Sequence, residues 1–557
     1  MTERILVGVA WPYANGPLHV GHIGGAYLPA DIFARYHRTK GNEVLMVSGS
    51  DQHGTPVTVR AEQEGVSPAD VADRYHQEFL DTWRKLGISF DLFTRTGTPN
   101  HAAVTQDFFL TLLNKGFIYK ATMVAPYCPT CSRFLPDRYV EGTCPFCGYN
   151  LARGDQCEQC GKPLNPFELI NPRCRFCGGP PEPRETEHFF LRLTAFNEEL
   201  LRWASSKTYW RPNVLNFTIR FLQEGLKDRA ITRDIEWGVP VPVAGFESKR
   251  IYVWFEAVIG YLSASIEWAK KTGEPDKWRE FWQKPAKTYY FVGKDNIFFH
   301  TIIWPAMLMG YAGLNLPYDV PANEYISLEG RKISTSRNWA VWVPDYLSRF
   351  DPDALRYILS INMPETSDTD FSWREFVRRN NDELVATYGN LVHRVLTFTY
   401  RNYQGAVPER GMLQEVDTIL LDRAQRSLET VGENIALCRF REGIREAMTL
   451  AQEANRYLEE KSPWKVIKGD RKAAATSAYV AISVINAMKV MLYPYLPFSS
   501  QKLHRMLGFP GRVEDSGWQF VEVPVGQALE RPEALFAKLD DKVAEEEIQR
   551  LNLTPNT

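Results

Sequence analysis

The spacing of apolar and polar residues gives the first part of the chain an alternating character. Residues 4–10 form an apolar, β-rich run typical of a buried parallel strand, and a helical stretch covers about 22–38. Residues 43–47 resemble a second strand, and a helical pattern extends from Pro68 to about Lys85. This alternation predicts an α/β domain built on a parallel sheet.

The alternation stops between residues 119 and 185, where Cys, Pro and Gly dominate. A mixed segment with many aromatic and basic residues follows to about 240. Strand-type runs return at Ile251–Phe255 and Tyr289–Gly293, and the second run leads into a helix from Asn296. We therefore expect one sheet whose chain is interrupted by an inserted segment.

The last third has the 3.6-residue periodicity of long helices, which predicts an all-helical bundle. The helical stretches cover 376–397, 416–435, 438–459 and 471–493. The segment 531–551 is charged and amphipathic, with Leu535, Phe536 and Leu539 on one face. We expect this segment either to dock on the body or to fray.

Composition is that of an ordinary globular protein, with 44% hydrophobic and 24% charged residues. The start of the chain lacks the basic and long apolar pattern of a secretory signal. The apolar run around 478–498 contains Asn486 and Lys489, so we interpret it as a core helix and not as a membrane span. These features predict a cytoplasmic protein with no membrane partner.

The formal net charge is −2, so a nucleic-acid partner has to be held by local basic patches. One such patch lies between residues 201 and 233. Its basic side chains are Arg202, Lys207, Arg211, Arg220, Lys227, Arg229 and Arg233. A charged helix face is commonly just a solvated face, so this patch alone supports RNA binding only weakly.

Eight of the nine cysteines fall in four Cys-x-x-Cys pairs, and two such pairs supply the four thiolates of a tetrahedral Zn²⁺ site. A disulfide framework is the alternative, and a large chain without a signal peptide argues against it. We expect two structural ions, with consecutive pairing of the pairs as the alternative arrangement. The inner site is Cys144, Cys147, Cys157 and Cys160, and the outer site is Cys128, Cys131, Cys174 and Cys177. Cys438 is expected to be a core thiol.

Two short motifs indicate a phosphate site. His19-Val20-Gly21-His22 lies where a helix should begin after the first strand, and unpaired N–H groups at a helix start suit phosphate. Lys332-Ile333-Ser334-Thr335-Ser336 follows a Gly-hinged turn, with further cations at Arg331 and Arg337. Alone, the first is more often a pair of ordinary histidines and the second a solvated turn. Their joint occurrence favours a nucleotide site.

With their flanking residues, these motifs resemble the methionyl-tRNA synthetases, a family of class I aminoacyl-tRNA synthetases. HVGH is similar to their "HIGH" signature and KISTS to their "KMSKS" loop. The other matching segments are Pro12–Gly16, Asp51–Pro56, Leu135–Arg138, Tyr252–Trp254, Gly293–Asp295, Trp304–Leu308, Asn455–Tyr457 and Pro463-Trp464. The resemblance covers nearly the whole chain.

The resemblance implies a methionine–tRNA ligase. Such an enzyme activates methionine with ATP to methionyl-adenylate and pyrophosphate, and then transfers the methionyl group to the 3′ end of tRNA(Met) for initiation and elongation. Its implied partners are L-methionine, ATP with Mg²⁺, and tRNA(Met). Nothing resembling a dimerisation module follows residue 551, which suggests a monomer.

The resemblance also implies roles for individual residues. Catalysis is expected from His19, His22 and Lys332. ATP is expected to contact Asn15, Gly21, Gly293, Asp295, Lys332, Ser334 and Ser336. Methionine is expected to contact Ala10, Trp11, Tyr13, Asp51, Trp254, Ala257, Tyr261 and His300, with Asp51 on the α-ammonium. The CAU anticodon is expected to be read by Asn390, Arg394, Pro463 and Trp464.

The domain boundaries expected from the resemblance follow the pattern changes described above. A Rossmann-type catalytic domain is formed by 1–117 and 241–325 and is split by a connective insertion with two zinc knuckles at 118–240. Residues 326–375 form a region with the KMSKS-type loop that contacts the tRNA stem, and 376–557 form the α-helical anticodon-binding domain with a C-terminal tail.

Three positions depart from the family pattern. Thr335 replaces a second loop lysine, and Arg331 or Arg337 is a candidate substitute. Trp11 stands where a smaller aliphatic residue is frequent, and Val258 where a proline often follows alanine. Two other functions are compatible with parts of the sequence. A small-molecule nucleotidylyltransferase would need neither the knuckles nor the bundle, and a non-catalytic RNA-binding relative would be expected to lose His19, His22, Asp51 or Lys332.

Overall fold

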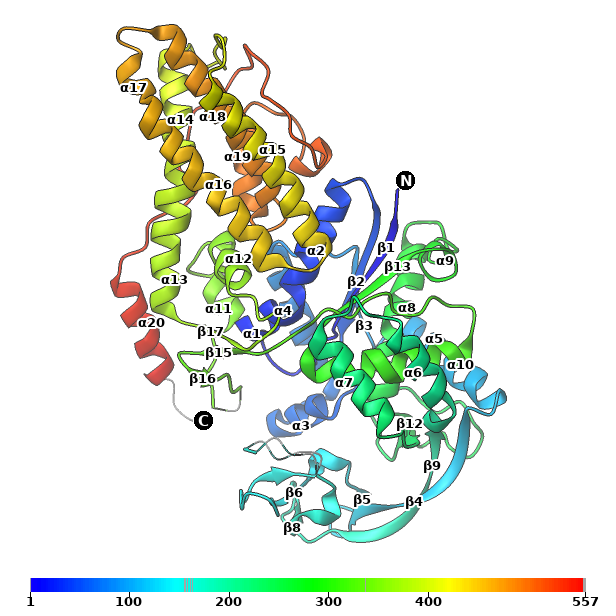
Figure 1. Ribbon diagram of the computed structural model, residues 1–557. Helices are drawn as coiled ribbons and strands as arrows, with labels where there is room; N and C mark the ends of the chain where they lie inside the picture. The colour runs from blue at the N-terminus through cyan, green and yellow to red at the C-terminus, as the bar shows by residue number, and fades with distance from the viewer. Residues whose placement is uncertain are drawn as a thin grey trace.

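The catalytic core is a five-stranded parallel sheet in the order β14-β13-β1-β2-β3 (Figure 1). The computed structural model describes residues 2–154, 157, 159–160, 162, 164–335 and 337–553. The strands are β1 (Arg4–Val9), β2 (Glu43–Ser50), β3 (Leu92–Arg95), β13 (Lys287–Gly293) and β14 (Ala322–Asn323). The chain before and after the insertion therefore builds one sheet, as the sequence predicts.

Both faces of this sheet are buried, which explains the continuous apolar run of β1. Ile5, Val7 and Val9 face one core cluster, and Leu6 faces the other. The first cluster includes side chains of α2 (Leu28–Thr39) and α4 (Pro68–Leu86). The second includes side chains of α5 (Pro99–Asn114), α8 (Val253–Lys271) and α10 (Trp304–Tyr311).

The strand predicted at Ile251–Phe255 is wrong. The structure has only the short β12 (Arg250–Ile251) there, and α8 begins at Val253 after the extended residue Tyr252. Aromatic and β-branched residues gave this segment a strand-like local composition. Its buried side chains nevertheless follow helical spacing, at Phe255, Ile259 and Leu262. Packing of that helical face in the second core cluster decides the conformation.

The insertion is a long antiparallel ribbon that carries a small cysteine-rich module (Figure 1). Strands β4 (Ile118–Cys128) and β9 (Glu182–Leu191) pair from Ile118↔Leu191 to Tyr127↔Glu182. The module contains β5 (Arg133–Phe134), β6 (Val140–Thr143), β7 (Ala152–Arg153) and β8 (Ile170–Cys174). It packs back on α3 (Thr55–Glu64), where the Thr58 and Tyr139 hydroxyls are 2.6 Å apart. After β9, α6 (Asn197–Ser205) and α7 (Pro212–Gln223) return the chain to the catalytic domain.

A connecting region and a helical bundle complete the chain. The region contains a three-stranded sheet of β15 (Ile326–Leu328), β16 (Arg331–Lys332) and β17 (Thr369–Phe371), with α11 (Val343–Leu347) and α12 (Pro352–Ile361). The bundle and tail helices are α13 (Trp373–Arg379), π-helix η7 (Asn380–Gly389), α14 (Asn390–Asn402), α15 (Glu415–Ala436), α16 (Phe440–Lys461), α17 (Pro463–Val466), α18 (Arg471–Leu492), α19 (Pro497–Met506) and α20 (Lys542–Leu553). The four predicted helical stretches are confirmed.

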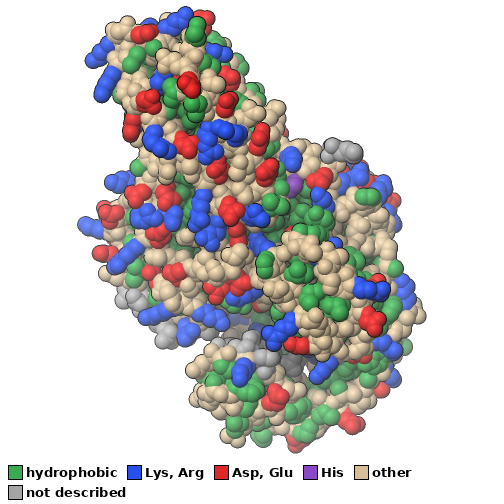
Figure 2. Space-filling model, viewed as in Figure 1, with side chains coloured by type: hydrophobic (Ala, Val, Ile, Leu, Met, Phe, Trp, Pro, Cys, Tyr) green, Lys and Arg blue, Asp and Glu red, His purple; other side chains and the backbone are tan. Residues whose placement is uncertain are grey.

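The C-terminal segment docks on the body, the first of the two predicted outcomes. Residues 531–541 are not helical, and Leu535 and Phe536 are buried in the large core cluster. Helix α20 follows, and its Glu547 is ion-paired with Arg349. Among the described helices, α18 alone is long and apolar enough to cross a membrane, and its apolar window is entirely buried. On the face shown in Figure 2, Lys and Arg alternate with Asp and Glu over the bundle.

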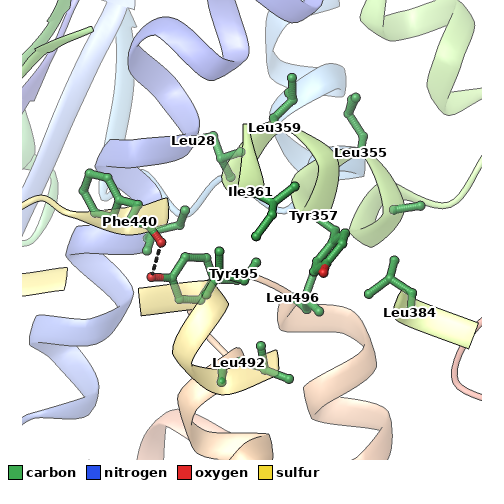
Figure 3. Packing of buried hydrophobic residues seen from close by; sticks show 14 of the residues in the cluster. Leu28, Leu355, Tyr357, Leu359, Ile361, Leu384, Phe440, Leu492, Tyr495 and Leu496 are labelled. Carbon is green, nitrogen blue, oxygen red and sulfur yellow. Dashed lines mark hydrogen bonds between the residues drawn. The ribbon is translucent and has the colours of Figure 1, made fainter. Parts of the chain in front are cut away.

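The bundle joins the catalytic domain through a buried apolar contact with a charged centre. Side chains of α2, α12 and the α18–α19 turn pack together, among them Leu28, Leu359 and Leu496 (Figure 3). Inside this contact, Arg356 Nη2 donates to Asp31 Oδ2 at 2.7 Å and to the Pro494 carbonyl at 2.8 Å. Burial opposes ionisation of Asp31, but the neighbouring Arg35 and Arg356 lower its pKa to about 2. A fully buried ion pair therefore ties α2 to α12 of the connecting region, and the same arginine donates to the Pro494 and Tyr495 carbonyls of the bundle.

We predict that Arg356→Ala lowers the free energy of unfolding by about 3–5 kcal/mol, because Asp31 loses a partner and three buried carbonyls lose a donor. Denaturant unfolding, followed by tryptophan fluorescence, measures this change. Arg84→Ala is the matched control, since Arg84 and Asp81 form an exposed pair that contributes about 0–1 kcal/mol. Equal, small effects of the two substitutions would contradict the role assigned to Arg356.

Candidate active site

A cavity of about 680 Å³ opens at the carboxyl ends of β1 and β13. β1 pairs with β2 on one side and with β13 on the other. The strands that follow β1 are therefore added first on one side of it and later on the other, and β1 marks the switch point of the strand order. Open α/β sheets bind ligands at such switch points. The cavity is lined by residues from the segment directly after β1, the helix that follows it, α8, the β13–α10 connection and the β15–β16 hairpin.

Most of the predicted catalytic, ATP and methionine residues line this one cavity. They are Ala10, Trp11, Tyr13, His19, Gly21, His22, Asp51, Trp254, Ala257, Tyr261, Gly293, Asp295, His300 and Lys332. Asn15 and Ser334 do not line it, and Ser336 lies outside the described residues. The structure thus brings together residues that are as much as 322 positions apart in sequence, from Ala10 to Lys332.

Several cavity residues were not predicted from the sequence. Arg138 is the last residue of the Leu135–Arg138 segment that resembles the family, and this segment could have predicted that Arg138 lies at the cavity. Phe299, Glu324 and Tyr325 carry no motif, and only their position after β13 and β14 places them at the cavity. Arg331 and Arg337, the candidate substitutes for a loop lysine, do not line the cavity. Arg331 stacks on the Trp339 ring, and Arg337 donates to the Ser334 hydroxyl.

His19 and His22 cap the start of the helix that follows β1. Gly21 N–H donates to His19 Nδ1 at 3.1 Å, and His19 N–H donates to His22 Nδ1 at 3.2 Å. The rings stack with centroids 3.7 Å apart. Burial, and then His22, lower the pKa of His19 well below its usual value, and burial lowers the pKa of His22 to about 4. Both rings are therefore neutral, and because Nδ1 accepts in each, the proton resides on Nε2.

The segment Val341–Val343, which follows the Lys332 loop, is attached to the histidine motif by backbone hydrogen bonds. Val20 N–H donates to the Val341 carbonyl at 3.1 Å, and Val343 N–H donates to the Leu18 carbonyl at 2.8 Å. A Cβ atom on Gly21 would lie 3.3 Å from the Ile333 side chain, so glycine permits this close approach. Lys332 is exposed on β16 and forms no ion pair among the residues the structure describes. Its ammonium group thus remains available for an anion in the cavity.

Asp51 is a buried carboxyl group at the end of β2. Its backbone is tied to the Pro12–Gly16 motif, since Asp51 N–H donates to Pro12 and its carbonyl accepts from Ala14 N–H. Oδ1 accepts from His53 N–H at 3.2 Å. Burial and the nearby Glu256 carboxylate raise the pKa of Asp51 to about 8, while His53 opposes this shift. A cationic group placed beside Asp51 would lower this pKa, because an opposite charge favours the ionised carboxylate.

The cavity wall is rich in aromatic side chains, and the polar atoms of Tyr261 and His300 in it are paired with each other. His300 Nδ1 lies 2.9 Å from the Asn296 carbonyl, and its Nε2 lies 2.7 Å from the Tyr261 hydroxyl. Burial lowers the pKa of His300 to about 4, so the ring is neutral. His300 therefore donates from Nδ1 and accepts the Tyr261 hydroxyl proton at Nε2. This internal pairing leaves a largely apolar pocket suited to a flexible apolar side chain.

The eight paired cysteines form two groups of four, with the inner and outer pairing expected from the sequence. Within each group all four sulfur atoms lie within 4.8 Å of one another. The Sγ–Sγ distance is 3.4 Å for Cys128 and Cys177, and 3.6 Å for Cys147 and Cys157. Four thiolates at about 2.3 Å from a tetrahedral ion would be about 3.8 Å apart, so each group fits such an ion.

Comparisons with known proteins agree over the whole chain. A family model for class I tRNA synthetases (M) matches residues 5–396, and a model for the anticodon binding domain of methionyl tRNA ligase matches residues 407–554. The methionine–tRNA ligase of Dehalococcoides mccartyi is 63% identical over 99% of this chain and 100% of that protein. The one from Thermomicrobium roseum is 55% identical over 99% of each chain. The chain belongs to the methionyl-tRNA synthetases.

The fold agrees with that of a solved methionyl-tRNA synthetase. The Mycobacterium tuberculosis methionyl-tRNA synthetase in complex with methionyl-adenylate superposes with a TM-score of 0.80 at 27% identity. The match covers 96% of this chain and 100% of that one. The Rossmann-type sheet and the helical C-terminal domain predicted from the sequence are thus confirmed.

In this methionyl-tRNA synthetase, the residues expected to read the anticodon lie on the bundle, outside the cavity. Asn390 and Arg394 are on α14, and Pro463 and Trp464 begin α17. The Arg394 guanidinium carbon lies 4.3 Å from the centroid of the Trp464 ring. Ser462 adopts a left-handed conformation with φ of 39°, which turns the chain sharply between α16 and α17. The structure thus brings Arg394 and Trp464 into contact on a partly exposed surface.

Proposed function

We propose that the cavity catalyses formation of methionyl-adenylate from methionine and ATP, followed by transfer of the methionyl group to tRNA(Met). The observation that carries this proposal is one cavity that combines neutral imidazole donors, an exposed lysine, a buried carboxyl and an aromatic pocket. The methionyl-adenylate bound by the M. tuberculosis relative supports the same assignment.

In the first step, the methionine carboxylate attacks the α-phosphorus of ATP and pyrophosphate leaves. Negative charge then builds on the phosphoryl oxygens. The Nε2–H groups of His19 and His22 and the Lys332 ammonium donate to these oxygens, and a single donor of this kind is worth about 2.7–4 kcal/mol in comparable sites. No general base is needed, because the attacking carboxylate is already ionised. Gly21, Gly293 and Asp295 line the side of the cavity assigned to adenosine, with Asn15, Ser334 and Ser336 as further proposed ATP contacts.

Asp51 holds the α-ammonium of methionine, and the thioether lies in the pocket formed by the other proposed methionine contacts. In the second step, a hydroxyl at the 3′ end of tRNA attacks the methionyl carbonyl and AMP leaves. Asn390, Arg394, Pro463 and Trp464 read the anticodon, since an accessible aromatic ring stacks on an unpaired base with about 1–3 kcal/mol. This division supports the domain boundaries proposed from the sequence, at 117/118, 240/241, 325/326 and 375/376.

The two cysteine groups hold Zn²⁺ with a structural role. All four ligands in each group are protein thiolates, so neither site has an open position for a substrate. Bound zinc stabilises the fold of the insertion, whose core cluster includes Cys128, Cys144, Cys157 and Cys174. Mg²⁺ enters with ATP and is held mainly by phosphate oxygens. The expectations of a monomer working in the cytoplasm stay predictions.

The chain is expected to exchange labelled pyrophosphate into ATP only when methionine is present. His22→Asn keeps an acceptor near Nδ1 for the helix cap but removes the Nε2–H donor, so exchange should fall at least about 100-fold. His22→Gln restores an N–H near Nε2 and should lose less. Methionine affinity, measured by equilibrium dialysis, should stay nearly unchanged. Exchange that depends on a different acid would indicate a nucleotidylyltransferase, and loss of methionine binding would make His22 structural.

The methionine KM is expected to depend on pH through Asp51. Because the pKa of free Asp51 is raised to about 8, the group is neutral below that pH and must lose a proton to pair with the ammonium. The KM should therefore rise as pH falls below about 8, approaching tenfold per pH unit, with little change in kcat. Asp51→Asn should give a high KM that is flat over the same range. A flat profile in the unsubstituted enzyme would rule out this linkage.

Two zinc ions per chain are expected by mass spectrometry, one for each cysteine group. Cys147→Ser and Cys177→Ser should each reduce the count by one, because each breaks a different group. Cys438→Ser is the control, since Cys438 lies in the bundle outside both groups and should leave both ions bound. Chelated, refolded protein should lose stability and aminoacylation. Full aminoacylation and normal stability without metal would contradict the structural role.

A further inference from the structure

Arg211 lies where the insertion, the catalytic sheet and the helical bundle meet. It is the N-cap residue of α7, at the end of the insertion. Its Nη2 donates to the Cys438 carbonyl at 2.7 Å, and its Nη1 donates to Asn323 Oδ1 at 2.7 Å and to the Ala322 carbonyl at 3.2 Å. These acceptors are neutral oxygens from two segments far apart in sequence. Arg211 forms no ion pair within 4 Å among the described residues, although its charge opposes the effect of burial, which raises the pKa of Asp319 and of Glu365.

On the catalytic side, the hydrogen bonds continue to the helix that begins with the two histidines. Asn323 is buried, and its Nδ2 donates to the Gly24 carbonyl at 2.9 Å. Gly24 belongs to the π-helix Ile23–Tyr27, directly after His22. Asn323 is also paired in the sheet with Gly293, which lines the cavity. One arginine donor is thus two hydrogen bonds away from the turn that carries His19 and His22.

A second connection from α7 reaches the cavity beside the first. Asn213 Nδ2 donates to Glu324 Oε1 at 2.8 Å, and Glu324 lines the cavity. The other oxygen of Glu324 accepts from Lys294 Nζ at 2.7 Å. The start of α7 is therefore fixed to the end of β14 by two side chains, Arg211 and Asn213. A displacement of this helix start would move the cavity wall with it.

On the bundle side, Cys438 lies in the turn between α15 and α16, where its φ is 54°. Helix α16 starts at Phe440 and ends at Lys461, immediately before the Ser462–Trp464 turn. At 1.5 Å per residue, its 22 residues span about 33 Å. Near Cys438 the helix is further held by Tyr495 Oη, which donates to the Phe440 carbonyl at 3.0 Å (Figure 3). One helix thus has Trp464 at one end and the Arg211 contact at the other.

We propose that Arg211 is a positioning residue. When tRNA binds at the anticodon surface, which is formed by Asn390, Arg394, Pro463 and Trp464, the resulting shift of α16 changes the position of the helix carrying His19 and His22 through Arg211. The inference rests on the proposed roles of Trp464 and of the two histidines. The five N–H donors of a guanidinium have a rigid planar arrangement. A shift of the Cys438 carbonyl therefore changes the hydrogen bonds to Asn323, and through Asn323 the position of Gly24.

Arg211→Lys tests this proposal, because one ammonium keeps the charge but cannot span both Cys438 and Asn323. Methionine-dependent pyrophosphate exchange without tRNA should stay within about twofold of the unsubstituted enzyme. The kcat for aminoacylation of full-length tRNA should fall about 10–30-fold, with the tRNA KM within about threefold. Arg220→Lys is the matched control on the same helix, since Arg220 is exposed and pairs only with Glu224 at the surface; both reactions should be unchanged.

A double substitution identifies the route. Trp464→Ala should raise the tRNA KM and lower kcat, and adding Arg211→Lys should lower kcat no further than the worse single variant, because both interrupt one path. If the two kcat losses multiply, the proposal is wrong. It is also wrong if Arg211→Lys slows pyrophosphate exchange in parallel with aminoacylation, or if it changes only the tRNA KM.

Asn323→Ala is the second variant if Arg211→Lys lowers the melting temperature strongly. In this variant too, pyrophosphate exchange should be unchanged while the kcat for aminoacylation falls. If the two reactions are affected equally, the proposal is wrong. Failure of the proposed function has a different signature. It appears as absence of methionine-dependent exchange in the unsubstituted enzyme, or as a Trp464→Ala variant with normal tRNA KM.

Discussion

The reciprocal cap between His19 and His22 is the interaction on which the catalytic architecture depends. It satisfies two N–H groups at the start of the helix with imidazole nitrogens, so the same two rings must present their protonated Nε2 atoms elsewhere. Because both rings are buried and neutral, each carries an N–H group at Nε2 and no positive charge. In the proposed reaction, positive charge for the phosphates comes from Lys332, which lies on an exposed hairpin and lines the same cavity.

The helix that starts with this cap also joins the two halves of the molecule. Its first turns accept a hydrogen bond from Asn323 at Gly24, and its later turns place Asp31 against Arg356 and the α18–α19 turn. A buried ion pair fixes that second contact rigidly, since neither charge can leave the interface without a large desolvation penalty. This helix is therefore bonded to the catalytic sheet at Gly24 and, through Arg356, to the bundle near Asp31, and Arg211 adds a separate contact between the sheet and the turn before α16.

Much of the secondary structure and both cysteine groups could be predicted from local sequence patterns. The buried strands, the long bundle helices and the four cysteine pairs each depend on short-range spacing, so periodicity and turn chemistry were sufficient to predict them. The segment Ile251–Phe255 shows where prediction from local sequence patterns fails. Its aromatic and β-branched residues favour a strand locally, whereas burial of Phe255, Ile259 and Leu262 against the sheet makes it a helix. Propensity is a weak effect, and tertiary packing overrides it.

The sequence by itself determined the chemical types in the site, because the histidine motif and the lysine loop occur together and their flanking segments, with Asp51 among them, resemble one family. Only the tertiary structure decided their states and partners. Burial beside Glu256 raises the pKa of Asp51, and mutual hydrogen bonds select the proton positions of His19, His22 and His300. Arg211 looked like one member of a basic surface patch, yet it holds three segments together. Charge states and long-range hydrogen bonds depend on the atoms that surround a group, and residues hundreds of positions away supply those atoms.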